Sequence, residues 1–144
     1  MTRYPDWAAR LEAYYQAHAA HKFKYGEWDC CHASLGAAEA ITGVYIGAAY
    51  RGGTSRAKTL AAANVDREVP YANWAELVED QMRAYGLTPI PAGKSSRGDL
   101  ILLHGRILGV VALDGQSAYV AKEIGYCRAT LSPDVLANAK AWRV

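Results

Sequence analysis

The chain has 144 residues, of which 51% are hydrophobic and 21% charged, a composition typical of one globular domain over residues 1–144. A net charge of +2 without any run of Lys or Arg argues against nucleic acid as a partner. No apolar run is long enough to cross a bilayer, and the polar N-terminal segment lacks the apolar core of a secretory signal. We therefore expect synthesis in a cytoplasm and no membrane span.

Helical signals open the chain. Aromatic and apolar residues recur at helical spacing from Trp7 to about Ala20 and predict an amphipathic helix. Asp29 is a favourable N-cap residue for a second helix, which we expect to reach Ile41 and to end at Gly43.

A glycine-rich aromatic segment, residues 45–53, has the composition of a loop. Its first part, residues 45–51, is a candidate contact surface for a partner, with an ordered cover over the domain's own cleft as the alternative. Ser55 predicts the start of a short helix that reaches residue 63. Asn73 begins a capping-box pattern and a helix that Gly86 ends.

The second half of the chain changes to short apolar runs that are typical of strands. Pro89, Pro91 and Gly93 predict a connector, and Asp114-Gly115 is a strong hairpin signal. We expect strands at residues 100–103, 108–113, 117–121 and 126–131, then a helix start at 132–134 and a last strand at 141–144. Helices followed by an antiparallel meander predict an α+β fold in one domain.

The segment before the second helix has the pattern of a nucleophile site. A polar loop with aromatic residues and glycine, residues 23–29, leads directly into Cys30 at the start of the helix. Unpaired backbone N–H groups at a helix start favour a thiolate over a thiol. The neighbouring Asp29 opposes this effect unless its carboxylate is occupied by capping. Thiol catalysis also requires a His base and a polar group that orients it.

Three motifs together resemble the NlpC-type cell-wall peptidases. They are Tyr25-Gly26-x-x-Asp29-Cys30, Arg97-Gly98-Asp99-Leu100-Ile101-Leu102 and Gly109-Val110-Val111-Ala112-Leu113-Asp114-Gly115. The chain is more closely similar to a family of small phage and prophage tail proteins. The shared features are the Phe-x-aromatic-Gly-x-x-Asp-Cys loop, a Gly-Asp strand, a Leu-Gly-Val strand and a terminal Ala-Trp-Arg-Val.

The resemblance implies a papain-like α+β domain with Cys30 in the position of the nucleophile and Asp29 as the helix cap beside it. It also places Ile107, or Leu108 after a one-residue slip, where the peptidases carry the catalytic His. The orienting polar residue would lie near 120–121, where the chain has Val and Ala. His104 is the remaining candidate base, with a solvated turn histidine as the alternative.

Other site chemistries receive less support. Cys30, Cys31, His32 and Cys127 are metal-ligand types, but adjacent side chains on a helix point apart, so we expect no metal and no cofactor. His32 should likewise not face Cys30. An odd number of cysteines, two of them adjacent, argues against a disulfide framework. We interpret Arg97-Gly98-Asp99 as a turn and a strand start and not as an adhesion motif.

Two functional hypotheses follow from the resemblance. The first is a structural or assembly component of a phage tail, at the tip or baseplate, on an NlpC-like scaffold that has lost its base. It would reside in the virion tail, with other tail proteins (tube, hub or tip fibres) as partners. The alternative is an active cysteine peptidase or amidase that degrades peptidoglycan during phage entry, with Cys30 as nucleophile.

Overall fold

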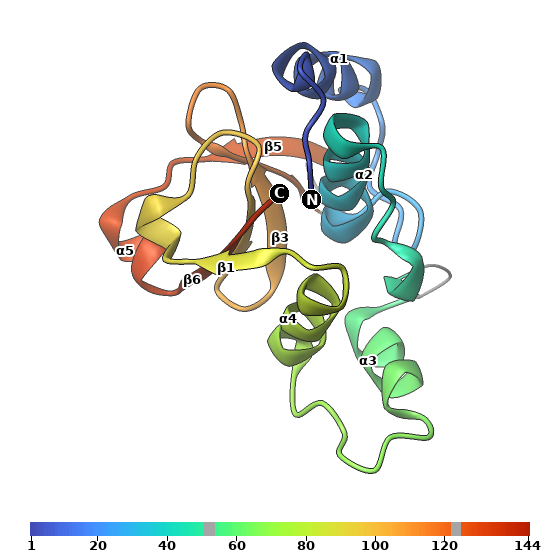
Figure 1. Cartoon of the computed structure of the whole chain (residues 1–144). Helices are drawn as coiled ribbons and strands as arrows, with labels where there is room; N and C mark the ends of the chain where they lie inside the picture. The colour runs from blue at the N-terminus through green and yellow to red at the C-terminus, as the bar shows by residue number, and fades with distance from the viewer. Residues whose placement is uncertain (51–53, 122–124) are drawn as a thin grey trace.

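The computed structural model describes residues 1–50, 54–121 and 125–144 (Figure 1). Its helices are α1 (Trp7–His18), α2 (Cys30–Thr42), α3 (Arg56–Asn64), α4 (Trp74–Ala84) and α5 (Pro133–Ala137), with short 3-10 helices η1 (Ala48–Tyr50) and η2 (Ala92–Lys94). Its strands are β1 (Thr88–Ile90), β2 (Leu100–Leu103), β3 (Ile107–Val111), β4 (Ser117–Ala121), β5 (Gly125–Ala129) and β6 (Ala139–Arg143).

The strands form one antiparallel sheet in the order β1-β6-β2-β3-β4-β5. Strands β2 to β5 are a meander, as expected, and β6 returns to pair with the free edge of β2. Four helices precede this meander and the chain forms a single small domain, so the prediction of an α+β fold is confirmed.

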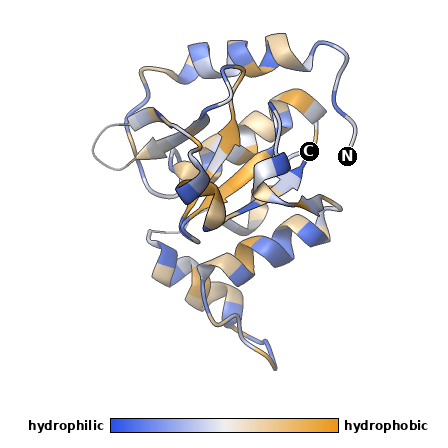
Figure 2. Cartoon of the chain, turned by 90° about the vertical axis from the view of Figure 1, so that its left-hand side faces the viewer, coloured by the Kyte–Doolittle hydropathy of each residue, from blue (hydrophilic) through white to orange (hydrophobic). Residues whose placement is uncertain are grey.

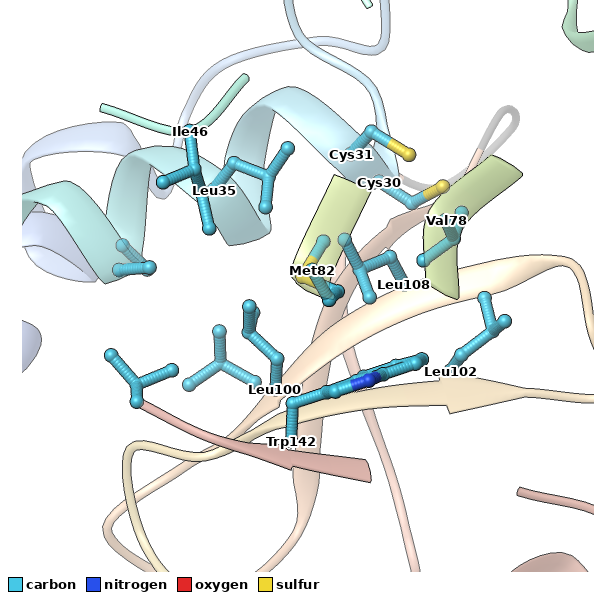
Figure 3. Close-up of a cluster of buried hydrophobic side chains, with 14 of the residues drawn as sticks. Cys30, Cys31, Leu35, Ile46, Val78, Met82, Leu100, Leu102, Leu108 and Trp142 are labelled. Atoms are coloured by element: carbon cyan, nitrogen blue, oxygen red, sulfur yellow. The ribbon is translucent and has the colours of Figure 1, made fainter. Parts of the chain in front are cut away.

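The two faces of the sheet pack against different helices. On one face, α2 and α4 cover the alternate residues Leu100 and Leu102 of β2, together with Leu108 and Trp142 (Figure 3). On the other face, α5 and η2 cover Ile101, Leu103 and their neighbours. Because successive strand side chains point to opposite faces, β2 is buried along its whole length. Figure 2 shows the hydrophobic segments gathered in the strands at the centre of the molecule.

The main difference from the sequence prediction is β1. The segment around Pro89 was expected as a connector, but Thr88–Ile90 pairs with β6 at the edge of the sheet. Proline is tolerated there because an edge strand has a neighbour on one side and can do without one N–H group. The other expected helices and strands are present, and their ends differ from the predicted ones by at most two residues.

A buried ion-pair network holds both ends of the chain against the sheet. Asp99, just before β2, is 0% exposed and its carboxylate lies 2.6 Å from Arg3 and 3.4 Å from Arg143. Arg3 also donates to the backbone oxygen of Val144, and Figure 1 shows the two termini close together. The Asp of Arg97-Gly98-Asp99 is therefore buried and paired, which confirms the interpretation of this motif as a turn and strand start.

Candidate functional site

The start of α2 is built around the carboxylate of Asp29. Its oxygens accept hydrogen bonds from the backbone N–H groups of Gly26, Cys31 and His32 and from Nδ1 of His32, at 2.8–3.0 Å. A carboxylate only accepts, so the His32 ring carries its proton on Nδ1 in this contact. Burial opposes ionisation of Asp29, but these hydrogen bonds outweigh it and hold the pKa of Asp29 below its ordinary value. The predicted cap is confirmed, and its carboxylate is fully occupied.

Cys30 and Cys31 lie side by side at the first turn of this helix and are 8% and 3% exposed. In Figure 3 the two cysteines lie next to each other at the start of α2, close to Val78 of α4. Both cysteines belong to the same buried cluster as Val78 and Leu108 of β3. Two buried thiols therefore lie where the start of α2 packs against the sheet.

The two thiols have opposite acidities. The hydrogen bond donated by the Cys31 thiol lowers the pKa of Cys30 to about 7, against the effect of burial, and a backbone hydrogen bond from Leu108 and the charge of Arg56 act in the same direction. The pKa of Cys31 is raised well above its ordinary value because Cys31 is the donor and is buried. Cys30 is therefore the more acidic thiol of the pair, and Cys31 keeps its proton beside it.

A pocket of about 450 Å³ opens onto these thiols. It is formed by the loop before α2, by η1, by the starts of α3 and α4, and by two strands of the sheet. The side chains that line it are mostly aromatic or polar: Phe23, Tyr25, Asp29, Cys30, Cys31, Tyr50, Thr54, Ser55, Arg56, Thr59, Trp74, Ile107 and Ala121. Its volume lies within the range of small-molecule sites.

The sheet side of the pocket is apolar. Ile107 at the start of β3 and Ala121 at the end of β4 line it, near the positions where a base and its orienting residue were expected. The side chain of Val120 lies outside the described part of the chain. None of the described residues that line the pocket is a histidine.

The histidines lie elsewhere. His104 occupies the exposed β2–β3 turn with a left-handed φ of 52° and does not line the pocket. His18, His21 and His32 line a different hollow beside Trp28. The structure thus brings Asp29 and Cys30 together, as predicted, and leaves His104 apart from them. Within the described residues, no group of His, Cys, Asp and Glu is arranged to hold a metal ion.

The contact between α2 and the sheet fixes the position of Cys30. The hydroxyl of Ser34, one turn along α2, donates to the backbone oxygen of Leu108 at 2.9 Å. The next residue, Gly109, is required by close packing between strands, because an added Cβ would meet the Ser117 hydroxyl and would lie 2.9 Å from the backbone oxygen of Ala118. The residues that resemble the peptidase strand therefore have structural roles: Leu108 anchors α2, and Gly109 allows β3 to approach β4.

Sequence reasoning missed three residues of this pocket. Tyr50 belongs to the segment that we considered as a contact surface, yet it is 2% exposed, and Ile46 is 0% exposed. Arg51 lies outside the described residues. Arg56 and Trp74 come directly after the helix caps Ser55 and Asn73. Their position beside a predicted cap was the sequence feature that could have indicated them as pocket residues. The structure supports the alternative interpretation, in which the described part of this segment covers the domain's own cleft.

Comparison with known families places the chain in one of them. A family model described as "Domain of unknown function (DUF6950)" matches residues 2–144, and the chain therefore belongs to this family. No curated protein matches the chain. Within the described residues, no helix is both long enough and apolar enough to span a membrane, as expected.

Proposed function

We propose that this member of the DUF6950 family is a structural or assembly component of a phage tail, built on an NlpC-like scaffold without a complete hydrolytic site. The resemblance of the sequence motifs to those of small tail proteins supports the tail role. One observation carries the claim that the hydrolytic site is incomplete: Ile107 and Ala121 line the Cys30 pocket near the expected positions of the base and its orienting residue. Neither the branched alkyl side chain of Ile107 nor the methyl group of Ala121 can accept a proton.

The retained residues fit a scaffold role. Asp29 and Gly26 build the loop and cap α2, and Gly109 allows β3 to approach β4. Each of these residues is needed to assemble the fold, whether or not Cys30 reacts. Residues that resemble a catalytic motif are thus accounted for by folding alone, and a tail protein would keep them for that reason.

The tail role is tested by deleting the gene from a phage or prophage that encodes it. We expect tails that are absent or incomplete, and restored assembly when either the wild-type chain or the Cys30→Ala variant is supplied in trans. The wild-type protein should also be found by mass spectrometry in purified particles. Normal particles formed without the protein, with no copy of it in wild-type particles, would contradict the proposal.

A second candidate rests on the acidity of Cys30. A buried thiol with a pKa of about 7 is a competent nucleophile, so a histidine supplied by a neighbouring chain would complete a peptidase or amidase that acts on peptidoglycan. Its test is the release of stem peptides from purified cell walls, by the protein alone and by particles that contain it. Release that Cys30→Ala abolishes would favour this candidate over the scaffold.

A further inference from the structure

Three side chains that line the Cys30 pocket carry buried hydrogen-bond donors without a partner among the described residues. These donors are the hydroxyl of Tyr50, Nε1 of Trp74 and Nε of Arg56. Tyr50 is 2% exposed, Trp74 is 8% exposed, and their ring centroids lie 5.5 Å apart. Buried donors are nearly always paired in folded proteins. Three unpaired donors around one hollow point to an acceptor that a bound group supplies.

The charges of the pocket specify the acceptor further. An indole N–H and a guanidinium only donate, and Arg56 makes no ion pair with the residues that the structure describes. Asp29 also lines the pocket, but hydrogen bonds from Gly26, Cys31 and His32 already occupy its carboxylate. A carboxylate from outside matches the planar guanidinium of Arg56 in both charge and shape.

The walls indicate what the carboxylate is attached to. Phe23 and Tyr25 on one side, and Ile107 and Ala121 on the sheet side, are aromatic or aliphatic. Pockets of this size take small molecules or single side chains whose apolar part meets such walls, while a few polar groups fix the orientation.

We propose that the Cys30 pocket binds a carboxylate carried on an apolar or aromatic body, with Arg56, Tyr50 and Trp74 donating hydrogen bonds to its oxygens. The inference rests on the donors of the pocket and goes beyond the tail role, so either one can fail without the other. The carboxylate can belong to a free organic acid or to the C-terminus of a peptide, and the experiment separates these two sources.

The experiment follows the indole N–H signals of the four tryptophans in ¹⁵N-labelled protein. N-acetyl-phenylalanine is titrated against its neutral amide, and a short peptide that ends in phenylalanine is titrated with a free and with an amidated C-terminus. Trp74→Phe assigns the Trp74 signal. Trp28 is an internal control, because its Nε1 is also buried and unpartnered but Trp28 does not line this pocket.

We expect the Trp74 signal to move downfield with the acid while the Trp28 signal stays in place, and the amide to bind at least about tenfold more weakly. Tyr50→Phe and Arg56→Gln should each weaken binding of the acid several-fold. Tyr15→Phe is the matched control, since it removes another buried and unpartnered hydroxyl that does not line the pocket, and it should leave the affinity unchanged.

Binding of the free acid alone assigns the pocket to small molecules, and binding of the free-ended peptide assigns it to a chain terminus. Both results support the proposal. It is overturned if the Trp74 signal does not move with either carboxylate, if the amide binds as tightly as the acid, or if Tyr50→Phe and Arg56→Gln bind the acid as the wild type does.

Discussion

Replacement of Cys31 by alanine should change the acidity of its neighbour Cys30. The hydrogen bond from the Cys31 thiol is the largest influence that lowers the pKa of Cys30 to about 7, and alanine cannot donate it. An ordinary cysteine has a pKa of about 8.5, so loss of this bond should move the pKa of Cys30 upward by as much as about 1.5 units, or about 2 kcal/mol.

The assay is the rate of alkylation by iodoacetamide as a function of pH, measured in a Cys127→Ser background because Cys127 is also accessible. The midpoint of the profile should move from about 7 to about 8.5. The thiolate fraction at pH 7 then falls about fifteenfold, but the more basic thiolate is a better nucleophile, so the rate at pH 7 falls only about threefold. The midpoint is therefore the decisive quantity.

Cys31→Ser is the matched control, because its hydroxyl keeps a donor at the same position and should hold the midpoint close to that of the parent. A midpoint that Cys31→Ala leaves in place would refute the assignment of Cys31 as the donor. A midpoint near 8.5 in the parent itself would refute the description of Cys30 as the more acidic thiol of the pair.

Three further predictions concern the ion-pair network, the strand contact and the pocket. Arg3→Ala leaves the buried Asp99 with only the more distant Arg143 and should lower the free energy of unfolding in urea by about 3 kcal/mol. As the control, Arg10→Ala breaks an exposed pair with Asp6 and should change this free energy little. Gly109→Ala should cost about 1–3 kcal/mol in the same measurement because its Cβ meets β4, while Gly93→Ala, with open space around it, should be neutral. Affinity for N-acetyl-phenylalanine should fall about tenfold as the pH rises through about 7, because the ionised Cys30 thiol then competes with the ligand carboxylate for Arg56. The Cys30→Ser variant should lose this pH dependence.

The pH dependence of binding is assigned to Cys30 because the other titratable groups around it change charge outside this range. Asp29 has a lowered pKa, and the pKa of Cys31 is raised well above its ordinary value. Burial raises the pKa values of Tyr25 and Tyr50, which face the thiols from the preceding loop and from η1. A pH dependence that persists in Cys30→Ser would show that another group competes with the ligand.

The parts of the fold that depend on local chemistry could be predicted from the sequence. Asp29, Ser55 and Asn73 cap helices as expected, because a cap needs only a side-chain oxygen and backbone N–H groups two or three residues away. The hairpin at Asp114-Gly115 likewise depends on neighbouring residues alone. The pairing of β1 with β6 joins segments about fifty residues apart, and nothing in the local pattern around Pro89 indicates it.

The candidate site was predicted in part for the same reason. The position of Cys30 at a helix start follows from one short segment. Its acidity depends on Arg56 and Leu108, and the unpartnered donors of the pocket come from η1, α3 and α4, so only the tertiary structure brings them together. The sequence pattern also marked residues 45–51 as a contact surface, since aromatic residues between glycines look alike whether they cover a partner or the chain's own core.

The most direct test is an electron-microscopy reconstruction of an assembled tail from a phage that encodes this chain. We predict that the chain lies within the tail, and that no imidazole nitrogen from its own or a neighbouring chain lies within hydrogen-bond reach, about 3.2 Å, of Cys30 Sγ. Absence of the chain from the tail, or a neighbour's histidine hydrogen-bonded to Cys30, would contradict the assignment of a tail component on a non-hydrolytic scaffold.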